Sequence, residues 1–173
     1  MEALTLALQA GFTRASPLDV STLRCQSQVR AMCAADRCGA YGKNHTCPPA
    51  CGTLEACQRR LQSCHQGLLL LTTGTLEDEF DYEAMRETEK RHNGSLRRFA
   101  AALKLQYPHA LCLGSGGCRI CQVCAYPAPC RFPELALSSM EAYGLAVSEI
   151  CRANGAAYRQ GPDTVTFVAC ALY

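Results

Sequence analysis

The chain lacks the features that mark several large protein classes. Its net charge is only +2, from 17 Lys and Arg against 15 Asp and Glu, so nothing in its composition points to a nucleic-acid surface. No apolar run approaches the roughly 20 residues that a membrane-spanning helix needs. The N-terminal segment carries Glu2 where a secretory signal peptide has basic residues, which predicts a cytoplasmic location.

Familiar catalytic motifs are missing as well. The sequence has no Ser/His/Asp set in a known arrangement, no P-loop and no dinucleotide-binding fingerprint. What remains is a chain of 173 residues, 49% of them hydrophobic and 18% charged, which is a typical globular composition. This length predicts a single domain over residues 1–173.

The pattern of apolar residues predicts the order of strands and helices. Strands are expected at 4–8, 68–72, 110–113 and 164–171. Helices are expected at 17–23, 53–66, 77–105 and 138–154, and a loop at 32–51. This alternation predicts an α/β (or α+β) domain in which a small mixed sheet is flanked by helices and by two cysteine-rich metal-binding loops.

Side chains that cap helices set the expected helix boundaries. Thr53 is the predicted N-cap of the helix at 53–66. Asn93-Gly94-Ser95 is expected to divide the helix at 77–105, with Ser95 capping its second half. Ser138 is predicted to form a capping box in which Glu141 reaches back to the Ser138 amide.

Cysteine is the most unusual component, with 14 residues in the chain. Most of them fall into two groups, and no cysteine lies between Cys64 and Cys112. In a cytosolic protein, such groups are more often metal sites than disulfides. The first group is Cys25, Cys33, Cys38, Cys47, Cys51, Cys57 and Cys64, and the second is Cys112, Cys118, Cys121, Cys124 and Cys130.

The second group contains the strongest chemical signal. Cys118, Cys121 and Cys124 follow the C-x2-C-x2-C spacing of bacterial ferredoxins, and Cys130 is near enough to supply a fourth thiolate. Structural zinc sites use paired C-x2-C arms that lie farther apart, so three evenly spaced cysteines fit zinc less well. The pattern favours a 4Fe–4S cluster, with zinc or a metal-free loop as the alternatives.

The first group predicts a second metal site. Its proposed ligands are Cys33, Cys38, Cys47 and Cys51, with Cys25 as the substitute for Cys51. The site would hold a second cluster or another metal, and the alternative is a set of buried free thiols. The remaining cysteines lie in or beside regular elements and are predicted packing residues: Cys57, Cys64, Cys112, Cys151 and Cys170.

Several other residues have expected roles around the cluster. The amides of Gly116 and Gly117 are predicted to bond to cluster sulfides. Arg131 is expected to offset the negative charge of a thiolate-ligated cluster or to bind an anionic partner, and Tyr41 to pack on the loop or bond to a sulfur. The histidines His65 and His92 are predicted surface residues rather than ligands.

The motifs taken together resemble a prokaryotic family of predicted metal-binding proteins, the domain of unknown function twenty-two eighty-four. The resemblance covers about Cys33 to Ala146 and implies a metal or iron–sulfur protein without implying a particular reaction. Leu137-Ser138 stands where the family typically has Arg-Pro before Ser-Met-Glu. The matching motifs are Cys33-x4-Cys38-x2-Tyr41-Gly42, Cys47-Pro48-Pro49, Cys118-x2-Cys121-x2-Cys124, Cys130-Arg131-Phe132-Pro133 and Ser139-Met140-Glu141-Ala142-Tyr143-Gly144.

Three functions are compatible with these sites. We favour electron transfer with a protein redox partner, because a cluster with four thiolate ligands has no open iron for chemistry. The second is an enzyme, or an accessory protein of a redox enzyme, which would need a substrate pocket beside the cluster. The third is a zinc-stabilised structural or sensory domain.

Overall fold

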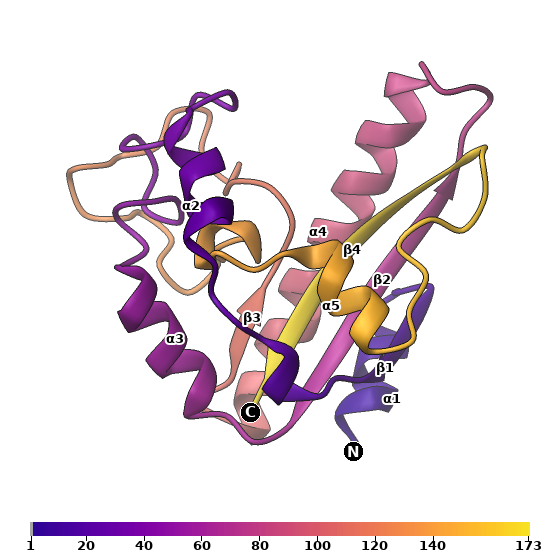
Figure 1. Cartoon of the computed structure of the whole chain (residues 1–173), viewed down its shortest axis with the longest axis horizontal. Helices are drawn as coiled ribbons and strands as arrows, with labels where there is room; N and C mark the ends of the chain where they lie inside the picture. The colour runs from indigo at the N-terminus through magenta and orange to yellow at the C-terminus, as the bar shows by residue number, and fades with distance from the viewer. Residues whose placement is uncertain (1) are drawn as a thin grey trace.

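A four-stranded sheet with strand order β1-β2-β4-β3 forms the centre of the computed structural model, which describes residues 2–173 (Figure 1). All three strand pairings are antiparallel, and β2 pairs with β4 along its whole length. The short strand β3 is therefore one edge of the sheet. The strands are β1 Arg14–Pro17, β2 Gly67–Thr75, β3 Leu111–Leu113 and β4 Thr164–Leu172.

Both faces of the sheet are buried, which explains the continuous apolar run in β2. Alternate residues of a strand point to opposite faces. Leu68 and Leu70 accordingly pack in one core, and Leu69 and Leu71 pack in the other. The first core is formed with α1 (Ala3–Gln9) and α4 (Tyr82–Gln106), which contribute the fully buried Phe99 among others.

The opposite face is covered by shorter elements. These are the 3-10 helices η1 (Val20–Thr22) and η2 (Glu141–Tyr143) with α3 (Leu54–Gln62) and α5 (Val147–Ala153). The remaining helix, α2 (Ser27–Ala34), packs against η2. The two cysteine-rich segments lie together at one side of the molecule, next to α2 (Figure 1).

The predicted fold class is confirmed, since the chain is a single mixed domain of helices and a sheet. The predicted strands at 68–72, 110–113 and 164–171 are present as β2, β3 and β4. The expectation of a mixed sheet is wrong, because every strand ladder is antiparallel. Thr53 is an N-cap as expected, since its hydroxyl accepts a hydrogen bond from the Ala56 amide. None of the helices in residues 2–173 is long and apolar enough to cross a membrane.

Two N-terminal predictions are wrong. Residues 4–8 belong to helix α1 rather than to a strand, and the buried Ala3, Ala7 and Ala10 form one helical face. Residues 17–23 contain the end of β1 and the single turn η1 rather than a full helix. Helix α2 takes up the start of the expected loop at 32–51, so Cys33 is helical.

The helices at 77–105 and 138–154 also differ from expectation. Helix α4 is unbroken, and Ser95 is fully buried in its interior rather than capping a second helix. The N-cap of α4 is Asp81, whose side chain accepts a hydrogen bond from the Ala84 amide. The segment 138–154 is divided into η2 and α5 by Gly144, whose φ is 78°. The capping side chain is Ser139, which accepts from the Ala142 amide, and Glu141 does not reach back to Ser138.

Candidate metal centre

The four cysteines proposed as cluster ligands in the second group line one cavity. Cys118, Cys121, Cys124 and Cys130 lie in the irregular segment between β3 and η2, and each of them is partly buried. A donor set made entirely of thiols suits zinc or an iron–sulfur cluster. Within residues 2–173, no three His, Cys, Asp or Glu side chains already converge on the position of a single metal ion. The four thiols thus surround a common space, but they do not converge closely enough to ligate a single metal ion.

Three consecutive residues of the first cysteine loop hold the second loop in place. Asn44 donates from Nδ2 to the Cys118 carbonyl at 3.0 Å, and the Cys118 amide donates to Thr46 Oγ1 at 3.3 Å. His45 Nε2 lies 2.7 Å from the Ala128 carbonyl. Both Asn44 and Thr46 are buried, so their polar groups need these partners. The two loops are therefore one structural unit.

Arg131 and Cys124 interact within the same unit. Arg131 Nη1 donates to the Val123 carbonyl at 3.1 Å and lines the cavity with the four cysteines. Hydrogen bonds from the backbone of Tyr126 and His45 lower the pKa of the Cys124 thiol, and the Arg131 guanidinium lowers it further. These contacts favour the thiolate, which is the form that binds metal. Arg131 thus lies beside Cys124, and its predicted role toward a cluster or an anionic partner stays a prediction.

Gly116 and Gly117 precede Cys118 in the same segment. Gly116 has a φ of 68°, which glycine adopts without strain. A Cβ on Gly117 would lie 3.6 Å from Cys47 Sγ, so this backbone runs close to a thiol of the first group. Within residues 2–173 the amides of Gly116 and Gly117 have no hydrogen-bond acceptor. They remain available for the bonds to sulfide that the sequence predicts.

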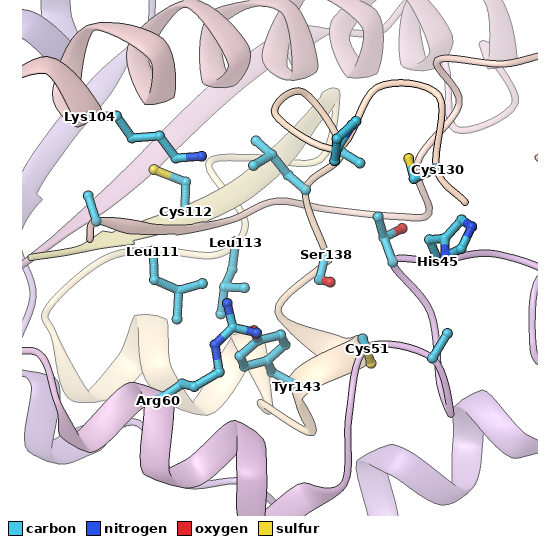
Figure 2. A pocket seen from close by; sticks show the side chains of 16 residues that line it. His45, Cys51, Arg60, Lys104, Leu111, Cys112, Leu113, Cys130, Ser138 and Tyr143 are labelled. Carbon is cyan, nitrogen blue, oxygen red and sulfur yellow. The ribbon is translucent and has the colours of Figure 1, made fainter. Parts of the chain in front are cut away.

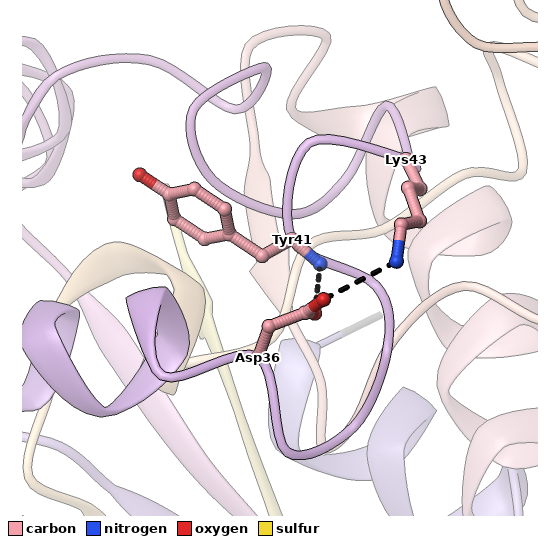
Figure 3. A network of polar contacts seen from close by, with 3 residues as sticks. All are labelled: Asp36, Tyr41 and Lys43. Carbon is pink, nitrogen blue, oxygen red and sulfur yellow. Dashed lines mark hydrogen bonds and ion pairs between the residues drawn. The ribbon is translucent and has the colours of Figure 1, made fainter.

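The loop of the first group is organised by Asp36 (Figure 3). Asp36 Oδ1 accepts from the Tyr41 amide at 2.9 Å, and Asp36 Oδ2 forms an ion pair with Lys43 at 3.2 Å. These two partners lower the pKa of the Asp36 carboxyl. The Tyr41 ring points away from the ion pair. The turn between Cys33 and Cys47 is thus fixed by a carboxylate that sequence analysis did not single out.

The two cysteine groups meet at Cys47. Burial raises the pKa of the Cys47 thiol, and the nearby thiols of Cys38, Cys33 and Cys118 raise it further. Cys47 is also buried, unlike the three thiols around it. The structure therefore brings three of the four cysteines predicted for the first site close to the first ligand predicted for the second site.

Cys51 has a different set of neighbours. The hydrogen bond that it shares with Cys57 raises the pKa of the Cys51 thiol, and its Sγ also donates to the Ala142 carbonyl at 3.5 Å. The same hydrogen bond, together with the nearby Arg30, lowers the pKa of Cys57 to about 7. Arg30 Nη2 lies 3.5 Å from Cys57 Sγ, and Nη1 donates to the Gly52 carbonyl. Cys51 therefore lies next to the Cys57–Arg30 pair and also close to Cys47.

Cys25, the substitute for Cys51 as fourth ligand, lies in the same neighbourhood. Its pKa is raised to about 11, mainly by burial and then by Cys57. The packing predictions agree with the burial of Cys57, Cys112, Cys151 and Cys170. Cys57 carries a polar contact as well, which its helical spacing gave no reason to expect.

The two histidines predicted to be surface residues differ in their exposure to solvent. His65 is exposed, as expected. His92 is fully buried on α4, where Nδ1 lies 2.9 Å from Thr72 Oγ1 and the ring packs edge-on against Phe12. The surface prediction is therefore wrong for His92.

The supporting residues missed by sequence analysis are Asn44, Thr46, Asp36 and Arg30. Each acts through contacts with residues that are distant in the sequence or through a turn with no standard spacing. The only available signal was that Asn44 and Thr46 lie three residues and one residue before Cys47. A polar residue in a cysteine-rich loop has many alternative roles, so this signal is weak.

Comparison with known proteins agrees with the metal-binding interpretation. The family model described as "Predicted metal-binding protein (DUF2284)" matches residues 16–173. The match extends well beyond the motif span at 33–146 and includes all four strands except the first two residues of β1. No curated protein and no solved structure matches the chain. The chain belongs to the DUF2284 family of predicted metal-binding proteins.

Proposed function

We propose that the chain binds a 4Fe–4S cluster through Cys118, Cys121, Cys124 and Cys130 and takes part in electron transfer. The observation that supports this most directly is that these four thiols line one cavity. The C-x2-C-x2-C spacing favours iron–sulfur over the paired arms of structural zinc. When bound, such a cluster supplies a one-electron couple.

The surrounding residues have distinct roles in this proposal. Asn44 and Thr46 hold the ligand loop through Cys118. Arg131 supplies a positive charge beside Cys124, and the open amides of Gly116 and Gly117 are donors for sulfide. Both effects favour the reduced, more negative state of a thiolate-ligated cluster.

Exposed apolar side chains beside the ligands suit a protein redox partner. Val123, between Cys121 and Cys124, is 75% exposed, and Phe132, two residues after Cys130, is 45% exposed. A partner that covers them would approach the ligand loop directly. We further propose that the partner is a cytoplasmic protein and that Cys33, Cys38, Cys47 and Cys51 hold a second cluster or another metal.

A zinc-held structural or sensory domain is the second candidate. It is favoured by the scarcity of regular structure in both cysteine loops, since such segments commonly depend on a metal for their order. In that case the thiols would bind zinc and no sulfide would be present.

Analysis of protein purified without oxygen separates these functions. We expect broad visible absorbance together with iron and acid-labile sulfide in equal amounts. Cys121→Ser should remove much of this absorbance, while the control Cys64→Ser, which lies outside both ligand sets, should keep it. A colourless wild-type protein that contains zinc and no sulfide would overturn the electron-transfer proposal.

A further inference from the structure

A cavity of about 360 Å³ lies at the free edge of β3, between α3, α4 and the two cysteine loops (Figure 2). This volume is within the range of sites for small organic molecules, roughly 300–1,000 Å³. One end of the cavity is lined by Arg60, Lys104 and β3. The other end is lined by Cys51 and Cys130, one cysteine from each predicted ligand set.

The charged side chains that line the cavity are all basic. Arg60 extends from α3 and Lys104 from α4, so they approach β3 from opposite sides (Figure 2). None of the lining residues is Asp or Glu. Within residues 2–173 the two side-chain ion pairs are Lys43–Asp36 and Arg119–Glu89, so neither Arg60 nor Lys104 has a carboxylate partner. Two unpaired cations at one cavity attract an anion.

The edge of β3 adds an apolar floor and a backbone donor. Leu111 and Leu137 line the cavity and are half-buried, whereas the Tyr143 ring is only 1% exposed. The guanidinium of Arg60 lies over the Tyr143 ring, with Cζ 5.7 Å from the ring centre, which helps to hold it in position.

The backbone donor follows from the hydrogen bonds of Gly114. The Gly114 amide bonds away from β4, to the Ser138 carbonyl, and the Gly114 carbonyl accepts from Met140 on the same side. Because the polar groups of a strand alternate in direction, the Cys112 amide also faces away from β4, toward the cavity. Residues 138–140 pair with Gly114 on this edge, but within residues 2–173 they give the Cys112 amide no hydrogen-bond acceptor.

We propose that this cavity binds a small organic carboxylate. Arg60 and Lys104 bind its carboxylate oxygens together with the Cys112 amide, and its carbon body lies against Leu111 and Leu137. A carboxylate fits better than a phosphate, because no glycine lines the cavity to provide the cradle of amides that phosphate sites use. Its position beside a cluster rests on the proposed function, whereas the binding itself does not.

Calorimetric titration of the purified holoprotein tests the proposal. The probes are succinate and phthalate, with inorganic phosphate as the comparison. We expect saturable binding of at least one carboxylate and a loss of affinity of about tenfold or more in both Arg60→Gln and Lys104→Gln, because each removes a charge-assisted contact. The control Arg59→Gln, on the same helix but outside the cavity, should bind like the wild type.

The proposal fails if neither carboxylate binds saturably at millimolar concentration, if phosphate binds as well as both, or if Arg60→Gln and Lys104→Gln bind normally. Iron and sulfide measured on the same samples distinguish this failure from that of the proposed function. Carboxylate binding by a protein without sulfide would support the site and overturn the cluster. An iron–sulfur protein that binds neither probe would support the cluster and overturn the carboxylate site.

Discussion

The backbone amide of Cys118 donates a hydrogen bond to the hydroxyl of Thr46, at 3.3 Å and across 72 residues of sequence. The Thr46 hydroxyl in turn donates to Asn44 Oδ1 at 3.0 Å, while Asn44 Nδ2 donates to the Cys118 carbonyl. The first ligand of the predicted cluster is therefore held on both its amide and its carbonyl by the opposite cysteine loop. A change in one loop should alter metal binding by the other.

Thr46→Val tests this coupling directly. The substitution keeps the shape of the side chain but leaves the partly buried Cys118 amide without its acceptor, which should cost about 1 kcal/mol. We expect faster loss of iron from Thr46→Val than from wild type when a chelator is added. Thr5→Val, at an exposed position on α1, should lose iron at the wild-type rate. Equal rates for wild type and Thr46→Val would mean that the loops bind metal independently.

Replacing Arg131 should change the redox potential of the predicted cluster. Arg131→Gln removes a positive charge beside Cys124, so the more negative reduced state becomes less stable and the midpoint potential should fall. Arg131→Lys keeps the charge and should recover most of the wild-type potential. Anaerobic redox titration checks both values. A wild-type potential in Arg131→Gln would assign Arg131 to the loop contact with Val123 alone.

Acid should destabilise the fold through His92. Burial lowers the pKa of His92 to about 4, below its usual value of 6.5. Above the usual value His92 is neutral in both the folded and the unfolded chain, so its contribution is constant. As the pH falls from 6.5 toward 4, the unfolded chain binds a proton that the folded chain does not. Stability should then fall by about 1.4 kcal/mol per pH unit, or about 3 kcal/mol in total.

Urea unfolding followed by circular dichroism measures the effect of His92. His92→Asn should be less dependent on pH than wild type across this window, whatever its stability near neutral pH. The exposed His109→Asn variant should keep the wild-type dependence. An unchanged pH dependence in His92→Asn would show that other groups cause the acid sensitivity.

Gly74 on β2 and Gly94 on α4 should respond oppositely to alanine. A Cβ on Gly74 of β2 would overlap Thr88 Oγ1 of α4, so Gly74→Ala should destabilise the fold by about 1–3 kcal/mol. Adding Thr88→Ala should restore part of this loss. Gly94 lies inside α4 with only the end of Arg98 near it, so Gly94→Ala should stabilise the fold by about 0.5–1 kcal/mol. Thermal unfolding that ranks the two variants in the reverse order would contradict the observed packing of α4 on β2.

The sequence predicted elements well where the pattern was local and uninterrupted. The run at Leu68–Leu71 is a strand because both faces of the sheet are covered, and Thr53 caps its helix through a contact three residues away. Prediction was wrong where tertiary packing outweighed local signals. Ser95 resembles a cap, but it is fully buried in the interior of α4, where packing on the sheet keeps the helix continuous.

The residues of the candidate site also fall into those that local sequence patterns suggest and those that only the tertiary structure reveals. The eight proposed cysteine ligands, Arg131, Gly116 and Gly117 could be proposed from the sequence because they lie in two short cysteine-rich segments, and their roles at a metal stay predictions. Asn44, Thr46 and Arg60 could not, because each acts across the fold on a residue or a cavity far away in the sequence. Their importance depends on the arrangement of β3 and the two loops, which periodicity does not provide.

Native mass spectrometry of protein purified and ionised without oxygen tests the central claim most directly, because it weighs the bound group together with the chain. We predict a species heavier than the bare chain by one or two whole 4Fe–4S units, and a species with one unit fewer when Cys118 and Cys121 are both replaced by serine. A wild-type spectrum that contains only the bare chain or the chain with zinc would contradict the assignment of Cys118, Cys121, Cys124 and Cys130 as ligands of an iron–sulfur cluster.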